Sequence, residues 1–176
     1  MLPMVVFCGI CFGAECEIPD AGSITFPDGD WQFYEPDNSD FRSENGVMII
    51  AASSRGCFIR IDALTGESVV ETEQLTKEDL YSVVKNMFPN EKGSGEILDF
   101  RHFMIGSHKT LSFLTRGFLA GFSDVPVKVT LVDVQGEQLS FLQLCVVKKH
   151  ENLCMRETDA IIATFKERSR DFSGIG

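Results

Sequence analysis

Strand-length apolar stretches alternate with short turns over the second half of the chain, and this pattern limits the fold more than any other feature. The turns fall at Gly106-Ser107, at 121–123 and at Gln135-Gly136. Links this short join antiparallel neighbours, because a parallel crossover needs a dozen or more residues. The stretches expected to form four consecutive antiparallel strands are 97–105, 109–119, 125–133 and 138–148.

A helix is expected on each side of this block. The first spans 76–88, where Thr76 and Asp79 approximate a capping box with Asp in place of the usual Glu, and apolar residues recur at helical spacing until Pro89. The second spans 153–168, with apolar residues on one side and basic residues at its carboxyl end, where they would favour the helix dipole.

Four further strands are expected before the first helix, at 23–26, 31–35, 47–52 and 57–63, the last two forming a hairpin. Strand 109–118 carries apolar residues on both faces, which is typical of a sheet covered on both sides. The chain has 176 residues, a length that suits one domain. These patterns predict an α+β fold in which an antiparallel β-sheet is flanked by helices.

The amino-terminal segment 1–16 begins with an almost unbroken apolar run over 2–12. The run is too short to span a bilayer, and small residues follow it, which is typical of a secretory signal peptide. The alternative is a buried amino-terminal strand. We therefore expect a single domain over 17–170, a frayed tail over 171–176, and a mature chain without an integral membrane span, located in the periplasm or secreted.

Three segments carry a resemblance to a known family: ITFPDGDWQFYE (24–35), TKEDLYSVVKNMF (76–88) and ETDAIIATFKER (157–168). With their order along the chain, they resemble the Mog1/PsbP-like proteins, and especially the exported bacterial DcrB-like (DUF1795) branch. The resemblance implies an α/β/α sandwich with an adaptor or binding role, and it supplies no catalytic signature.

The charge balance disfavours some partners. The formal net charge is -10 and the isoelectric point is about 4.7, so the chain repels nucleic-acid backbones. The sequence contains no nucleophile elbow and no phosphate-binding loop, and we expect no cofactor and no catalytic residue.

Cysteines and histidines are the remaining candidates for chemistry. Removal of the signal would leave four cysteines, Cys16, Cys57, Cys145 and Cys154, of which Cys145 and Cys154 are the expected disulfide pair; the alternative is that the four are separate buried thiols. His102 and His108 lie on consecutive strands, near Asp99, so a hairpin could assemble a weak zinc site from them. The alternative is two ordinary surface or half-buried histidines.

An apolar patch is the candidate binding surface. Its residues, on the second strand of the block and the turn after it, are Leu114, Phe118, Leu119 and Phe122. They would contact another protein if exposed, or support a covering helix if buried.

Three functions fit these observations. The first is an exported, non-enzymatic binding or scaffold domain. The second is a cytoplasmic acidic adaptor or chaperone that binds hydrophobic segments of a secreted partner. The third is a small metal-dependent enzyme that uses His102 and His108.

Overall fold

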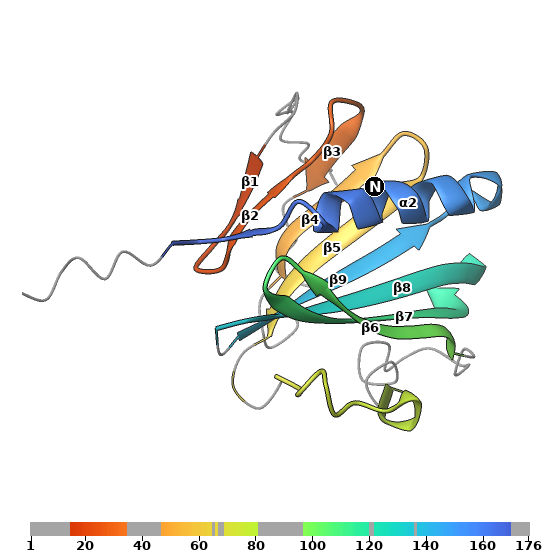
Figure 1. Cartoon of the computed structure of the whole chain (residues 1–176). Coiled ribbons are helices and arrows are strands. Elements are labelled where there is room, and N and C mark those ends of the chain that lie inside the picture. Colours follow the sequence, from red (N-terminus) through yellow and green to blue (C-terminus); the bar gives the residue numbers. More distant parts are fainter. Residues whose placement is uncertain are drawn as a thin grey trace, which may run out of the picture.

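A seven-stranded antiparallel sheet dominates the computed structural model (Figure 1). The structure describes residues 15–34, 47–64, 66, 69–80, 97–119, 122–135 and 137–169; for 47–48, 117–119 and 122–124 it describes the backbone only. The segments 1–14, 81–96 and 170–176 therefore lie outside the described residues, and with them most of the expected first helix, signal segment and tail.

The sheet has the strand order β3-β4-β5-β9-β8-β7-β6. Its strands are β3 (Trp31–Tyr34), β4 (Val47–Ser53), β5 (Cys57–Leu64), β6 (Ile97–Ile105), β7 (His108–Leu119), β8 (Phe122–Val134) and β9 (Glu137–Cys145). The four-strand block and the β4–β5 hairpin are confirmed. β9 ends at Cys145, three residues before the expected end, and a 3-10 turn follows over Lys148–His150.

A small second sheet joins the two ends of the domain in the order β1-β2-β10. It consists of β1 (Glu15–Ile18), β2 (Gly22–Thr25) and β10 (Lys166–Glu167). β1 begins at Glu15, so regular structure starts two residues before the expected boundary at 17.

One face of the large sheet, called here the α2 face, packs against α2 (Glu151–Ile162). Ile59, Ile61 and Phe141 from the sheet meet Ile161 and Ile162 from the helix, and all five side chains are buried. The helix expected over 153–168 is therefore too long at its carboxyl end. It ends at Ile162 because Thr164 donates to the Ile161 carbonyl and accepts from the Thr25 amide, which directs the chain into β10. Lys166 consequently lies in a strand and does not face the helix dipole.

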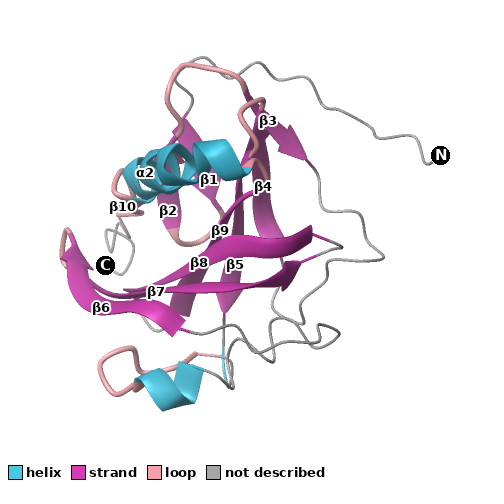
Figure 2. Cartoon of the chain, turned by 90° about the vertical axis from the view of Figure 1, so that its right-hand side faces the viewer, coloured by secondary structure: helices cyan, strands magenta, loops and turns pink. Residues whose placement is uncertain are grey.

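The segment 69–80 covers the opposite face (Figure 2). Gln138 is fully buried there and its amide donates to the Val70 carbonyl and to Asp133, while Thr72 donates to the other Asp133 oxygen. The expected capping box is confirmed, since the Thr76 amide donates to Asp79 over 2.8 Å and the Asp79 amide donates back over 3.4 Å. Residues 77–80 are helical, and Leu80 is buried against the sheet. The structure is thus α+β with an antiparallel sheet covered on both faces, as the sequence predicts.

Candidate functional site

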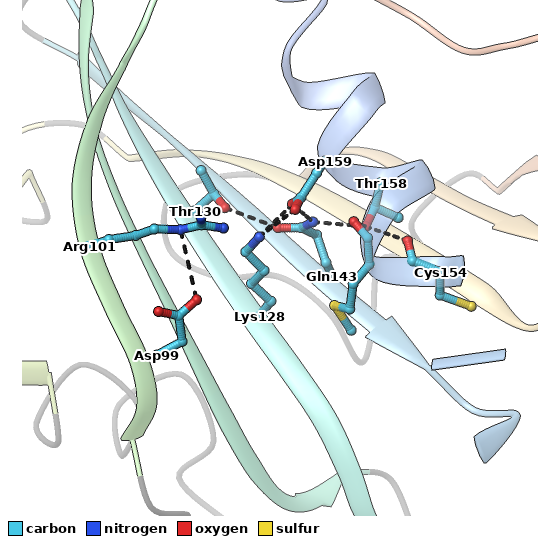
Figure 3. A network of polar contacts seen from close by, with 9 residues as sticks. Asp99, Arg101, Lys128, Thr130, Gln143, Cys154, Thr158 and Asp159 are labelled. Atoms are coloured by element: carbon cyan, nitrogen blue, oxygen red, sulfur yellow. Dashed lines mark hydrogen bonds and ion pairs between the residues drawn. The ribbon is translucent and has the colours of Figure 1, made fainter. Parts of the chain in front are cut away.

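A buried polar network lies between α2 and the sheet (Figure 3). The Lys128 ammonium on β8 donates to both Asp159 carboxylate oxygens over 2.6 Å. The Gln143 amide on β9 donates to Thr158 and to Asp159, both over 2.8 Å, and accepts from Thr130 over 3.0 Å. The polar side chains from β8, β9 and α2 therefore satisfy one another.

This network is suited to holding the helix in place. Every oxygen and nitrogen named above has a partner, so the network links β8, β9 and α2 without leaving any of these polar groups unsatisfied. The ammonium of Lys128 is buried, and the Asp159 carboxylate compensates its charge. Sequence reasoning overlooked these residues, although one signal was available: Lys128 and Gln143 are polar residues inside apolar strands.

The two candidate zinc ligands do not meet. His102 pairs with Leu111 and donates to the Thr72 carbonyl on the opposite face, whereas His108 pairs with Ile105 and donates to the Asp133 carbonyl. Because three positions separate Leu111 from His108 on β7, the two imidazoles extend from different faces of the sheet. Among the residues that the structure describes, no three His, Cys, Asp or Glu side chains form a group that could hold a metal ion.

The expected cysteine pair does come together, and a third thiol joins it. Cys145 on β9 lies directly opposite Cys57 on β5, and Cys154 on α2 belongs to the same buried cluster, close enough for both thiols to affect its pKa. All three are buried and present as free thiols, while Cys16 on β1 is half-buried and packs against the same hydrophobic core.

A buried ion pair lies on the opposite face of β5. Arg60 donates to Asp62 over 2.7 and 3.0 Å. Burial raises the pKa of Asp62, and the hydrogen bond and charge of Arg60 offset part of that rise. The Arg60 guanidinium therefore compensates the Asp62 carboxylate, as the Asp159 carboxylate compensates the Lys128 ammonium.

The edge strand β6 carries most of the exposed apolar surface. Of the four large hydrophobic side chains that are exposed among the described residues, three lie on this strand: Leu98 (48%), Phe103 (38%) and Met104 (56%); the fourth is Val146 (43%). β6 stands at the end of the strand order, and β7 is its neighbour in the sheet. We call the strand from Leu98 to Met104 the β6 edge.

Of the apolar patch expected from sequence, Leu114 lies beside the β6 edge. Leu114 is half-buried and pairs with Asp99 of β6. Leu119 and Phe122 pair across the β7–β8 turn. The side chains of Phe118, Leu119 and Phe122 lie outside the described residues, so their part in a binding surface stays a prediction.

Comparison with known proteins identifies the fold of the chain. No protein-family model and no curated protein sequence matches the chain. Among solved structures, it is similar to cyanobacterial PsbP (CyanoP) from Synechocystis sp. PCC 6803, with a TM-score of 0.63 and 11% identity over 91% of this chain and 96% of that one. The chain has a Mog1/PsbP-like fold.

The Mog1/PsbP-like fold agrees with the resemblance seen in the sequence, while membership of the DcrB-like branch stays a prediction. The chain is also similar to LpqN, involved in cell envelope biogenesis of Mycobacterium tuberculosis, with a TM-score of 0.46 and 15% identity over 89% of this chain and 90% of that one. No helix among the described residues is long and apolar enough to cross a membrane.

Proposed function

We propose that the chain is a non-enzymatic binding domain that takes up an extended segment of another protein along the β6 edge. The observation that carries this proposal is the concentration of exposed Leu98, Phe103 and Met104 on one terminal strand of the sheet. An exposed edge strand with apolar side chains favours the addition of a further strand.

The backbone of β6 supports strand addition. Ile105 and His108 flank a two-residue turn in which Gly106 has a φ of 58°, the geometry of a tight hairpin. Residues that flank such a turn form a hydrogen-bonded pair. Along the two strands, hydrogen-bonded pairs then alternate with non-hydrogen-bonded pairs, whose amide and carbonyl groups point away from the partner strand. By this alternation, the amide and carbonyl groups of Phe100, His102 and Met104 point away from β7, where an added strand would meet them.

The side chains of the β6 edge indicate what the added segment contains. Asp99 and Arg101 alternate with apolar residues, and the Arg101 guanidinium lies 5.7 Å from the centre of the Phe103 ring. A segment of alternating apolar and charged residues, with a carboxylate near Arg101, complements this pattern. On the neighbouring strand, Leu114 would extend the contact, and Phe118, Leu119 and Phe122 are further candidate contacts.

A crosslinking experiment tests the binding surface. A photoreactive residue at position 103 of the full chain should crosslink to a defined protein in extracts of the native host, and the same residue at position 146 should not. Position 146 is the matched control because Val146 is as exposed as Phe103 but lies beyond the end of β9. Equal crosslinking from both positions would contradict the proposal.

The proposal places the domain outside the cytoplasm. The apolar run over 2–12 and the small residues after it support export. Mass spectrometry of the protein from its native host should find a chain cleaved near residue 16. An intact Met1 on cytoplasmic protein would contradict export, and would favour the alternative of a cytoplasmic adaptor for hydrophobic segments of a secreted partner.

A further inference from the structure

The three buried thiols near the start of α2 belong to no part of the proposed function. We propose that Cys57, Cys145 and Cys154 form a thiol–disulfide centre that holds one disulfide at a time, with Cys154 as the common member. The bond expected from sequence, Cys145–Cys154, is then one of two alternatives, and Cys57–Cys154 is the other. The centre lies on β5, β9 and α2, away from β6 in the strand order, so it does not rest on the binding proposal.

The strand register brings Cys57 and Cys145 close. The Val146 amide donates to the Gly56 carbonyl over 3.0 Å, which makes Gly56–Val146 a hydrogen-bonded pair. The neighbouring pair Cys57–Cys145 is then a non-hydrogen-bonded pair, the kind in which opposite side chains approach most closely. Two thiols are thus held side by side on the α2 face.

Cys154 approaches both strand thiols from α2, which packs on this face of the sheet. It lies in the first turn of α2 and is fully buried in the same core cluster as Cys57 and Cys145, close enough for both thiols to affect its pKa. One turn further along α2, Glu157 accepts from the Cys57 thiol over 3.6 Å, so this side of the helix lies over the two strand thiols. Side-chain rotation can then bring Cys154 into disulfide geometry with a strand thiol. Because Cys154 lies near both strand thiols, it can bond to either.

The oxidation needs a disulfide donor such as oxidised glutathione. Two S–H bonds of the cluster and the S–S bond of the donor break, and one S–S bond forms in the cluster. The donor takes up the two electrons and the two protons and becomes two thiols. The Cys57 thiol donates to Glu157 over 3.6 Å, so this carboxylate can accept its proton. The remaining thiol can then attack Cys154 and exchange the bond without any net oxidation.

Burial controls when this reaction occurs. Burial is the main factor that raises the pKa of Cys57 and of Cys154, so the folded chain holds little thiolate at neutral pH. The charged groups around the centre are Glu157, its partner Arg55, and Asp30, which lies 3.6 Å from Arg55. We therefore expect oxidation while the chain folds or when α2 opens, and slow exchange afterwards.

The test uses the full chain, refolded from denaturant in glutathione buffers of graded oxidised-to-reduced ratio. Free thiols are alkylated and the protein is digested with trypsin. The three cysteines fall in separate tryptic peptides, 56–60, 129–148 and 150–156, while Cys16 lies in another. Mass spectrometry therefore identifies each linked pair without ambiguity.

We expect Cys154 to be linked to Cys145 or Cys57 in most molecules at the oxidised end of the series. The C57S variant should retain Cys145–Cys154, and the C145S variant should retain Cys57–Cys154. C16S is the matched control and should leave the cluster unchanged. Circular dichroism checks that each variant folds, and the wild-type peptide map decides the question even where a variant does not.

Either of two results would overturn the proposal. One is a wild-type chain whose three cluster cysteines remain fully alkylated at every glutathione ratio. The other is a disulfide that joins Cys57 to Cys145 and leaves Cys154 free.

Discussion

Lys128 and Asp159 show how a single residue can hold α2 on the sheet. Removing the carboxylate leaves the buried Lys128 ammonium without its partner, whereas removing the ammonium leaves a carboxylate that water can reach, because the Asp159 side chain is 40% exposed. The two changes should therefore have unequal costs.

We predict that Asp159→Ala lowers the free energy of unfolding by about 2 kcal/mol, below the usual cost of breaking a buried pair because Asp159 is partly solvated. Lys128→Met should lower the free energy of unfolding by about 1 kcal/mol or less, because the methionine side chain is apolar and similar in length to lysine. Urea unfolding of the two variants measures the difference. Equal losses would show that the pair contributes as an exposed ion pair does.

Asp62 gives a prediction about pH. Because its pKa is raised, the folded chain holds the Asp62 proton more tightly than the unfolded chain does. The stability that results is complete below the ordinary aspartate pKa of 3.8 and is lost as the pH rises through the folded value.

Wild-type protein should therefore lose stability relative to the Asp62→Asn variant as the pH rises from about 4 towards neutrality. Asparagine does not titrate, and its carbonyl can still accept from Arg60. Urea midpoints of both proteins across this range provide the measurement. A difference that stays constant or changes in the opposite direction would contradict the effect of burial on Asp62.

At the scale of elements, the packing of β10 against β2 depends on Gly22. A Cβ atom at this position would lie 2.1 Å from the Lys166 carbonyl oxygen, a backbone atom that can move only if β10 moves. Gly29 provides a matched control, because its φ of 159° resembles the 158° of Gly22 and an added Cβ would meet nothing within 4 Å.

We predict that Gly29→Ala costs about 1 kcal/mol through backbone strain at its positive φ, and that Gly22→Ala costs about 1–3 kcal/mol more through the overlap with Lys166. Thermal unfolding compares the two variants, and amide hydrogen exchange at residues 166–168 should become faster in Gly22→Ala alone. Similar losses in both variants would show that the substitution acts through backbone strain.

The elements that the sequence predicts best are those with local signals. β6 to β9 and the β4–β5 hairpin have apolar stretches bounded by turn residues, and the capping box at Thr76 is visible in the sequence itself. β10 could not be predicted in this way, because two residues such as Lys166 and Glu167 carry no periodicity and are strand only through pairing with β2. The same long-range contact ends α2 earlier than its apolar pattern indicates.

The candidate sites follow the same rule: contacts between residues near in sequence are predictable, and contacts made by strand pairing are not. Cys145 and Cys154 are near neighbours in sequence, and the structure brings them together, but Cys57 joins them only through the pairing of β5 with β9. For His102 and His108, the register of the hairpin determines whether the two side chains share a face. A two-residue turn pairs position 105 with position 108, and successive residues then alternate between the two faces of the sheet, which places His102 and His108 on opposite faces. A spacing motif that ignores the faces of a strand predicts a metal site where none can assemble from these two residues.

At the scale of the whole molecule, the chain combines an exposed edge strand with a net charge of -10. Charged residues on an edge strand discourage pairing between identical copies, and Asp99 and Arg101 of β6 are both exposed. Apolar side chains on the same strand favour a complementary partner. Under the binding proposal, these two features together would let the β6 edge select its partner and resist pairing with identical copies.

Blocking an outward backbone amide of this edge should weaken binding beyond the loss of the side chain. We predict that Met104→Pro lowers affinity for the crosslinked partner about tenfold more than Met104→Ala does, because one intermolecular hydrogen bond contributes about 1–1.5 kcal/mol. Val146→Thr, the matched control, should bind as the wild type does. Surface plasmon resonance with the folded variants provides the affinities, and equal affinities of Met104→Pro and Met104→Ala would exclude pairing at that amide.

Amide hydrogen exchange of the full chain, with and without the crosslinked partner, tests the central proposal most directly. If a strand adds to β6, the amides of Phe100, His102 and Met104 should exchange at least about tenfold more slowly in the complex. Protection confined to other elements, with these three amides unchanged, would contradict the assignment of β6 as the binding edge.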